Sequence, residues 1–110
     1  MSQTSTTATF VSLGCWKDVI PRAIDGDLEP IINPTFLYDE HYKRRSNPVQ
    51  KCFKAALSQG YSVFAVQDGG QCFSSNSAQF TYKKNGSSNE CVQGKGGPMA
   101  NDVYEIKVAN

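Results

Sequence analysis

The segment from Gly60 to Ser74 constrains the fold more than any other part of the chain. Residues Tyr61–Gln67 are rich in β-branched and aromatic side chains, and Asp68-Gly69-Gly70 follows them directly. This composition is typical of a strand that ends in a tight turn. Because apolar residues occupy both alternating sets of positions, we expect the strand to be central and buried on both faces. The two glycines are expected to supply the positive φ angles of the turn, and Gln71–Ser74 begins a strand running back.

An amphipathic helix is predicted immediately before this strand. Ser46 or Asn47 is a suitable N-cap, and Pro48 suits the first turn, where no N–H is needed. Gly60 is expected to end the helix. Apolar residues recur at i, i+3, i+4, i+7 and i+8, which places one stripe on the core face: Val49, Cys52, Phe53, Ala56 and Leu57.

The four cysteines, at positions 15, 52, 72 and 91, include no C-x-x-C pair, which argues against a zinc ribbon or a thioredoxin motif. Two disulfides in an oxidising compartment are the simplest account. Three pairings are possible and the spacing does not choose among them, but the helix and the return strand are placed to favour a Cys52–Cys72 bridge. Four reduced cysteines in a cytosolic protein are the less favoured alternative, because small domains with modest cores usually need cross-links.

The 110 residues are enough for one domain. Residues 1–8 are expected to be a flexible lead-in, because they are polar and lack the basic and apolar regions of a signal peptide. If the protein is secreted, Met1 would be a residue introduced for expression after removal of the signal peptide. The domain is expected to span residues 9–108, beginning with an edge strand over Thr9–Trp16. A long irregular segment, Asp25–Arg45, follows, with one helical turn at Asp39–Lys43.

The last third of the chain is expected to contribute two strands. A short strand is predicted over Ala78–Tyr82, before the Asn-Gly turn at Asn85-Gly86, which also begins an Asn-Gly-Ser glycosylation sequon. The alternation in Asp102–Val108 predicts a final strand whose Tyr104, Ile106 and Val108 point inward. Together these elements describe a small α+β domain, with one main helix packed on a small antiparallel sheet.

Several segments, taken in order from Leu13 to Ile106, resemble the WSC domain, a small cysteine-rich extracellular module. Three groups of residues carry the resemblance: Leu13-Gly14-Cys15-Trp16-Lys17-Asp18 with Arg22-Ala23-Ile24 at the opening, Cys52, Gly60-Tyr61 and Gly69-Gly70-Gln71-Cys72-Phe73 in the middle, and Gly96-Gly97 with Val103-Tyr104 at the end.

The chain departs from the family in having fewer cysteines. Ala56 and Ser74 stand where the family has a helix cysteine and a strand cysteine, which suggests one disulfide deleted as a unit, and Lys95 stands where it has another. The resemblance implies a Cys52–Cys72 bridge and leaves Cys15–Cys91 as the second. It also implies a secreted, carbohydrate-binding, lectin-like module. A protein-interaction, matrix or adhesion module is the alternative, with its apolar patch expected over Ile31–Tyr42.

Sugar binding needs an aromatic face and a few well-placed planar polar groups. The candidate ligand residues are Trp16, Asp18, Arg22, Asp68, Gln71, Asn101 and Asp102. The main candidates also have structural alternatives. Trp16 can pack on the neighbouring disulfide, and Asp68 can bond to its own turn. Lys17, Asp18 and Arg22 can form a structural ion network that holds the loop, which contributes little if it is exposed.

Other functions have less support in the sequence. The single histidine, His41, lies in a polar segment without a paired nucleophile, so we expect no enzyme and no cofactor. Asp25, Asp27 and Glu29 form only a weak candidate calcium site, because the six to eight oxygen ligands that calcium prefers are not visible.

The charge pattern also limits the partners. A net charge of +1 argues against nucleic acid, and no apolar run is long enough for membrane insertion. The cluster Lys43-Arg44-Arg45 is expected to be a solvated face, with sulfated glycans or an acidic protein as a second interpretation. The expected partner is therefore a glycan or an extracellular protein.

Overall fold

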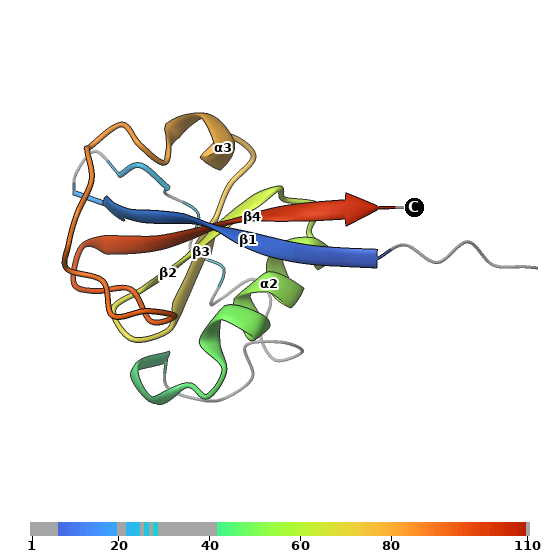
Figure 1. The fold of residues 1–110 in the computed structure, drawn as a ribbon, viewed down its shortest axis with the longest axis horizontal. Coiled ribbons are helices and arrows are strands. Elements are labelled where there is room, and N and C mark those ends of the chain that lie inside the picture. The colour runs from blue at the N-terminus through green and yellow to red at the C-terminus, as the bar shows by residue number, and fades with distance from the viewer. Residues whose placement is uncertain (1–6, 20–21, 25, 27, 29–41, 110) are drawn as a thin grey trace, which may run out of the picture.

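The computed structural model describes residues 7–19, 22–24, 26, 28 and 42–109 (Figure 1). Its elements follow the order β1 (Thr7–Lys17), η1 (Tyr42–Arg44), α2 (Pro48–Ser58), β2 (Val63–Gln67), β3 (Gln71–Ser74), α3 (Ala78–Thr81) and β4 (Ala100–Ala109). Within these residues the strands form one antiparallel sheet in the order β1-β4-β2-β3, and α2 and α3 lie on its opposite faces. The predicted α+β class, with one main helix on a small antiparallel sheet, is confirmed.

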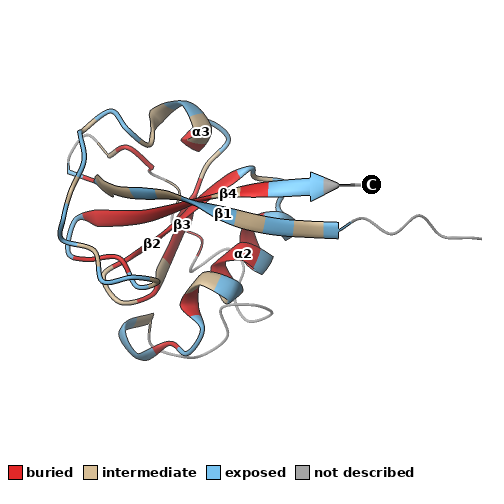
Figure 2. Cartoon of the chain, in the orientation of Figure 1, coloured by how far each residue is buried: buried red, intermediate tan, exposed pale blue. Residues whose placement is uncertain are grey.

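The centre of the sheet is β2, which is buried along its whole length between β4 and β3 (Figure 2). Phe64 and Val66 point into the core beneath α2, and Val63 and Ala65 point into the core beneath α3. The prediction of a central strand buried on both faces is therefore confirmed.

The turn after β2 differs from the prediction in the position of its positive φ angles. These fall on Asp68 (φ 51°) and Gly69 (φ 104°), and not on Gly70. Aspartate tolerates the left-handed region of positive φ because its short side chain can interact with the local backbone. Gly70 is required for another reason, since a Cβ there would lie 2.6 Å from the carbonyl oxygen of Tyr42.

Helix α2 begins and ends as predicted, but its buried stripe is rotated. Asn47 is the N-cap with φ 49° and without a side-chain capping bond, and Gly60 follows the helix with φ 80°. Ala55 is fully buried, whereas Leu57 is 39% exposed. The core face that packs on the sheet therefore includes Ala55 in place of the predicted Leu57.

The predicted strand over Ala78–Tyr82 is wrong, because residues Ala78–Thr81 form the short helix α3. Only Ala78 of this helix is buried, and it joins the core on that face of the sheet. The hydroxyl of Thr81 donates to the carbonyl of Ala23, which ties α3 to the segment after β1. A segment of five residues is too short to distinguish the apolar period of a helix from that of a strand. Tertiary contacts therefore decide its conformation.

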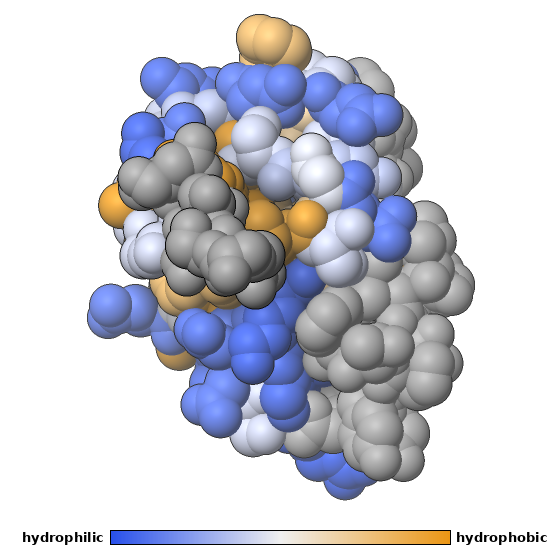
Figure 3. Space-filling model, turned by 90° about the vertical axis from the view of Figure 1, so that its right-hand side faces the viewer, coloured by the Kyte–Doolittle hydropathy of each residue, from blue (hydrophilic) through white to orange (hydrophobic). Residues whose placement is uncertain are grey.

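Strand β4 buries both of its faces near its beginning, which the predicted one-sided pattern did not include. Val103 is fully buried, Tyr104 and Ile106 are also buried, and Val108 is 57% exposed. The reason is the pairing: β2 covers β4 only from Asn101 to Glu105, so the end of β4 pairs with β1 alone. Figure 3 views the end of the molecule where β1 begins and β4 ends, and shows apolar surface flanked by hydrophilic side chains.

The edge strand β1 begins at Thr7, two residues earlier than predicted. A shift in its pairing with β4 lies between Ser12 and Gly14, where Gly14 adopts φ 100°. The first six residues and most of the predicted irregular segment, including residues 29–41, lie outside the described part of the chain. The described end of that segment contains the single 3₁₀ turn η1.

Both predicted disulfides are confirmed. Cys52–Cys72 joins α2 to β3 and is completely buried, and Cys15–Cys91 joins β1 to the segment before β4. The second bridge encloses a sequence separation of 76 residues, against 20 for the first. It therefore restricts the unfolded chain more strongly.

We predict that Gly96→Ala will destabilise the fold far more than Gly60→Ala. Both glycines have positive φ angles, which cost an L-residue about 1–2 kcal/mol. A Cβ at Gly96 would in addition lie 2.1 Å from the carbonyl oxygen of Val66, whereas a Cβ at Gly60 meets nothing within 4 Å. Urea unfolding should therefore show about 3 kcal/mol more destabilisation for the Gly96 variant. Equal losses would contradict this packing.

Candidate functional site

Antiparallel pairing brings most of the predicted ligand residues to one end of the sheet. Trp16, at the end of β1, pairs with Asn101 at the start of β4, and Asn101 also pairs with Gln67 at the end of β2. The β2–β3 turn, which carries Asp68, lies at the same end. The strand pairing therefore brings these residues to the same end of the sheet, but the burial of their side chains differs greatly.

Asp18 is completely buried and accepts four hydrogen bonds. The backbone N–H groups of Ala23 and Ile24 donate to Oδ1, at 2.7 and 3.2 Å. The Nε2 group of Gln67 donates to Oδ2 at 2.8 Å, and the guanidinium of Arg22 lies 3.2 Å from the same oxygen. These bonds compensate the loss of hydration that burial of a carboxylate entails.

Asn101 belongs to the same network, because its Oδ1 accepts a second hydrogen bond from Gln67 Nε2 at 2.9 Å. Its side chain is fully buried. In this conformation neither Asp18 nor Asn101 is accessible to a ligand, and both connect β2, β4 and the segment after β1. A direct contact of either residue with a ligand stays a prediction.

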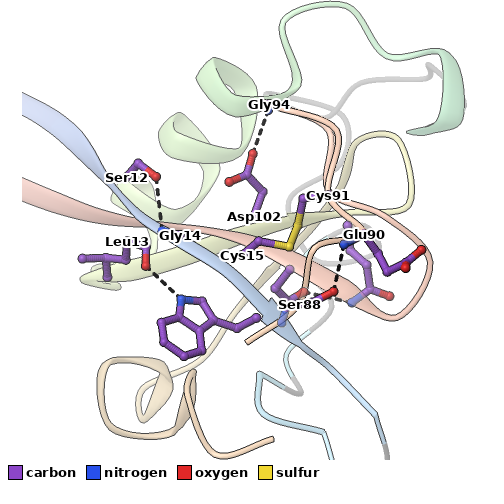
Figure 4. The surroundings of a disulfide bond; sticks show 12 residues. Ser12, Leu13, Gly14, Cys15, Ser88, Glu90, Cys91, Gly94 and Asp102 are labelled. Atoms are coloured by element: carbon purple, nitrogen blue, oxygen red, sulfur yellow. Dashed lines mark hydrogen bonds between the residues drawn. A yellow bond between two sulfur atoms is a disulfide. The ribbon is translucent and has the colours of Figure 1, made fainter. Parts of the chain in front are cut away.

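Asp102 lies on the other face of the sheet. Its Oδ2 accepts a hydrogen bond from the N–H of Gly94, at 2.7 Å (Figure 4). The same oxygen accepts a hydrogen bond from the hydroxyl of Tyr104, at 2.8 Å. Burial raises the pKa of the Tyr104 phenol, and the hydrogen bond to Asp102 and its negative charge add to this effect. The phenol is therefore a neutral donor at physiological pH.

Above Asp102 the surface is hollowed into a groove of about 580 Å³, called here the Phe10–Tyr104 groove. The rings of Phe10 and Tyr104 form its base, with centroids 5.6 Å apart and planes at 87°. Its rim carries three amide side chains and one amine, from Asn47, Gln50, Gln93 and Lys95. Asp102 fixes two residues of the groove, Tyr104 and Gly94.

This groove could not be predicted from the sequence. Its residues come from β1, the beginning of α2, the segment before β4, and β4 itself, so no local motif contains them. Of the seven candidate ligand residues named above, Asp102 alone contacts residues of the groove, through its bonds to Gly94 and Tyr104. The polar residues Asn47, Gln50 and Gln93 carried no pattern by which they could have been selected.

Trp16 lies on the opposite side, packed at the margin of the core beneath α3. Its indole N–H donates to the carbonyl of Leu13 at 2.8 Å (Figure 4), and its ring meets that of Tyr82 edge to face at 5.7 Å. The ammonium of Lys83 lies 5.7 Å from the indole ring. The half-buried indole thus keeps some exposed surface. We call the surface formed by Trp16, Tyr82 and Lys83 the Trp16 surface.

The remaining predicted ligand residues keep partial exposure. The guanidinium of Arg22 lies over the ring of Phe73 at 5.1 Å. Asp68 accepts from the hydroxyl of Tyr42 at 3.4 Å and pairs with Lys43 at 3.6 Å, beside a smaller hollow of about 260 Å³. Gln71 is half-buried at the start of β3.

The other candidate sites are not covered by the described residues. His41 and the weak calcium candidates Asp25, Asp27 and Glu29 lie outside them. Within the described ranges, no group of three or more His, Cys, Asp or Glu side chains is placed to hold a metal ion. None of the helices in these ranges has the length and apolar character needed to cross a membrane.

Comparison with known proteins identifies a family. The family model of the WSC domain matches residues 12–97, which is well over half of the chain. WSC domains are extracellular modules of the carbohydrate-binding type, in agreement with the two disulfides. No curated protein matches the chain.

We predict that Asp18→Asn will lower the free energy of unfolding by about 3–5 kcal/mol, because it replaces a buried anionic acceptor by an amide that faces four donors. The matched control is Asp68→Asn, at a half-exposed site with a surface ion pair, where the expected loss is below about 1 kcal/mol. Chemical denaturation of both variants measures the difference. A loss below about 1 kcal/mol for Asp18→Asn would refute the structural role of this carboxylate.

A second prediction concerns alkaline pH. The unfolded chain begins to lose its tyrosine protons near pH 10, whereas folded Tyr104 keeps its proton to higher pH. The unfolded state therefore binds fewer protons, and stability falls as the pH rises above about 10. Tyr104→Phe has no proton to lose at this position. Urea titrations at about pH 9 and about pH 11 should show a smaller loss of stability in the variant, and an equal loss would contradict the assignment.

Proposed function

Because the chain belongs to the WSC domain family, we propose that it is an extracellular, lectin-like module that binds carbohydrate without catalysis. The observation that carries the proposal is the Phe10–Tyr104 groove. It combines an aromatic base with a rim of planar amides, within a volume typical of small-ligand sites.

The chemistry of the groove suits a sugar. One face of a pyranose ring presents C–H groups that pack on aromatic rings, and its hydroxyls pair with groups that both donate and accept. Asn47, Gln50 and Gln93 each offer one carbonyl and one NH₂ group. Among the described lining residues Lys95 alone is charged, which favours a neutral or anionic glycan over a cationic one.

The Trp16 surface is the alternative location for the sugar. Of the residues predicted from the sequence, Trp16, Arg22, Asp68 and Gln71 keep partial exposure, and Trp16 is the one that belongs to this surface. In either location the buried residues Asp18, Asn101 and Asp102 would act by positioning other groups.

A protein-interaction module is the second candidate function, and Phe80 is the observation that favours it. This ring is 82% exposed on α3. The apolar patch predicted over Ile31–Tyr42 lies almost entirely outside the described residues. Self-association measured by light scattering, and abolished in Phe80→Ser, would support this function over sugar binding.

We predict that a glycan array will show selective binding that depends on the groove. Gln50→Ala and Gln93→Ala should each weaken binding of the best glycan about tenfold, which corresponds to the loss of about 1.4 kcal/mol of hydrogen bonding. Gln59→Ala is the matched control, because it removes an exposed glutamine outside the groove, just after α2. Affinities are measured by calorimetry on variants that retain the wild-type unfolding midpoint.

Three outcomes would change the account. Binding lost in Trp16→Ala but kept in both groove variants would place the sugar on the Trp16 surface. Binding lost on removal of calcium would direct attention to Asp25, Asp27 and Glu29. An array without selective binding, for protein with both disulfides formed, would overturn the carbohydrate function.

A further inference from the structure

The Asn-Gly-Ser motif at residues 85–87 has no role in the proposed sugar site. We propose that Asn85 is an N-linked glycosylation site, so that this module itself carries a glycan, placed beside the Trp16 surface and away from the Phe10–Tyr104 groove. The proposal rests on the extracellular character of the family and not on the proposed function.

The sequence singles out Asn85 among the asparagines. Transfer requires Asn-x-Ser/Thr in which x is not proline. Asn85-Gly86-Ser87 is the only such triplet in the chain. Asn33-Pro34-Thr35 has the same spacing but is excluded by its proline.

The motif lies on an exposed turn of defined conformation. Gly86 adopts φ 89°, and a Cβ added to it would meet nothing within 4 Å, so the surrounding space is open. Gly86 and Ser87 are both exposed. The turn is fixed to the end of β1, because the N–H of Lys17 donates to the carbonyl of Gly86 at 2.9 Å.

The amide of Asn85 is compatible with this modification. Its Nδ2 group donates to the carbonyl of Val19 at 3.1 Å, and the side chain is half-exposed. The glycosidic bond forms between Nδ2 and C1 of the first sugar as the bond from C1 to a lipid-pyrophosphate donor breaks. One amide proton leaves and the pyrophosphate is the leaving group. The nitrogen keeps its other proton and remains a donor.

The neighbours of the turn determine what the glycan would cover. Ser87 forms an isolated β-bridge with Trp16, and the Lys83 ammonium lies 5.7 Å from the indole ring. A glycan on Asn85 therefore emerges beside the Trp16 surface. The groove, with its rim residues from the beginning of α2, lies on the other face of the sheet and stays open.

The test is secretion of the full chain, fused to a cleavable signal peptide, from cultured insect cells, followed by intact mass measurement before and after peptide N-glycosidase. We expect a glycan mass that the enzyme removes, with conversion of Asn85 to Asp in the peptide map. Ser87→Ala should abolish the added mass. Ser88→Ala is the matched control, because it changes the next serine, leaves the motif intact and should keep the glycan.

The wild-type protein decides the proposal even if a variant fails to fold. Secreted wild-type chain with both disulfides formed and an unmodified Asn85 would overturn it. A glycan that persists in Ser87→Ala would overturn it as well. Because the readout is mass and not affinity, failure here is distinct from failure of the proposed sugar binding.

Discussion

The buried carboxylate of Asp18 is the interaction on which the end of the sheet depends. A single charged side chain holds the backbone of Ala23 and Ile24 and, through Gln67, both β2 and β4. A charge buried in this way is tolerated only when its hydrogen-bonding capacity is filled, and it becomes costly as soon as one partner is removed. The network therefore specifies one arrangement of three chain segments where the sheet alone would leave freedom.

A disulfide and a second buried carboxylate, that of Asp102, hold the surface around the groove in place in the same way. Cys15–Cys91 fixes the segment before β4, and Asp102 on β4 accepts hydrogen bonds from Gly94 of that segment and from Tyr104 of β4. The Phe10–Tyr104 groove thus has a rigid side built from internal hydrogen bonds. Its exposed rim carries three amides, which bind without ionising, and the amine of Lys95. Buried carboxylates thus hold the fold, while most of the groups that face the ligand are neutral, and this separation suits a binding module.

Much of the fold was predictable because local patterns and tertiary contacts agree. The apolar alternation and the Asp-Gly-Gly turn identified β2, and the Pro and Gly boundaries identified α2. The apolar patterns gave wrong predictions where tertiary contacts determine the structure. Residues 78–81 form a helix and not a strand, and β4 buries both faces only where β2 pairs with it. Of the site, Asp18 and Asn101 are predicted from the sequence as ligand residues, and that role stays a prediction. The sequence does not indicate that both are buried, because their shared network depends on Gln67 from another strand. The amides of the groove carry no sequence pattern at all.

The most direct test of the account is ¹⁵N–¹H chemical-shift mapping during titration with the glycan that the array selects. Progressive shifts are expected at the amides of residues 47, 49, 50, 93–95 and 104, with the amides of Ala23 and Ile24 unchanged because Asp18 keeps them in place. Shifts concentrated at Trp16 and Tyr82 would instead locate the sugar on the other face of the sheet and contradict the central claim that the groove is the binding site.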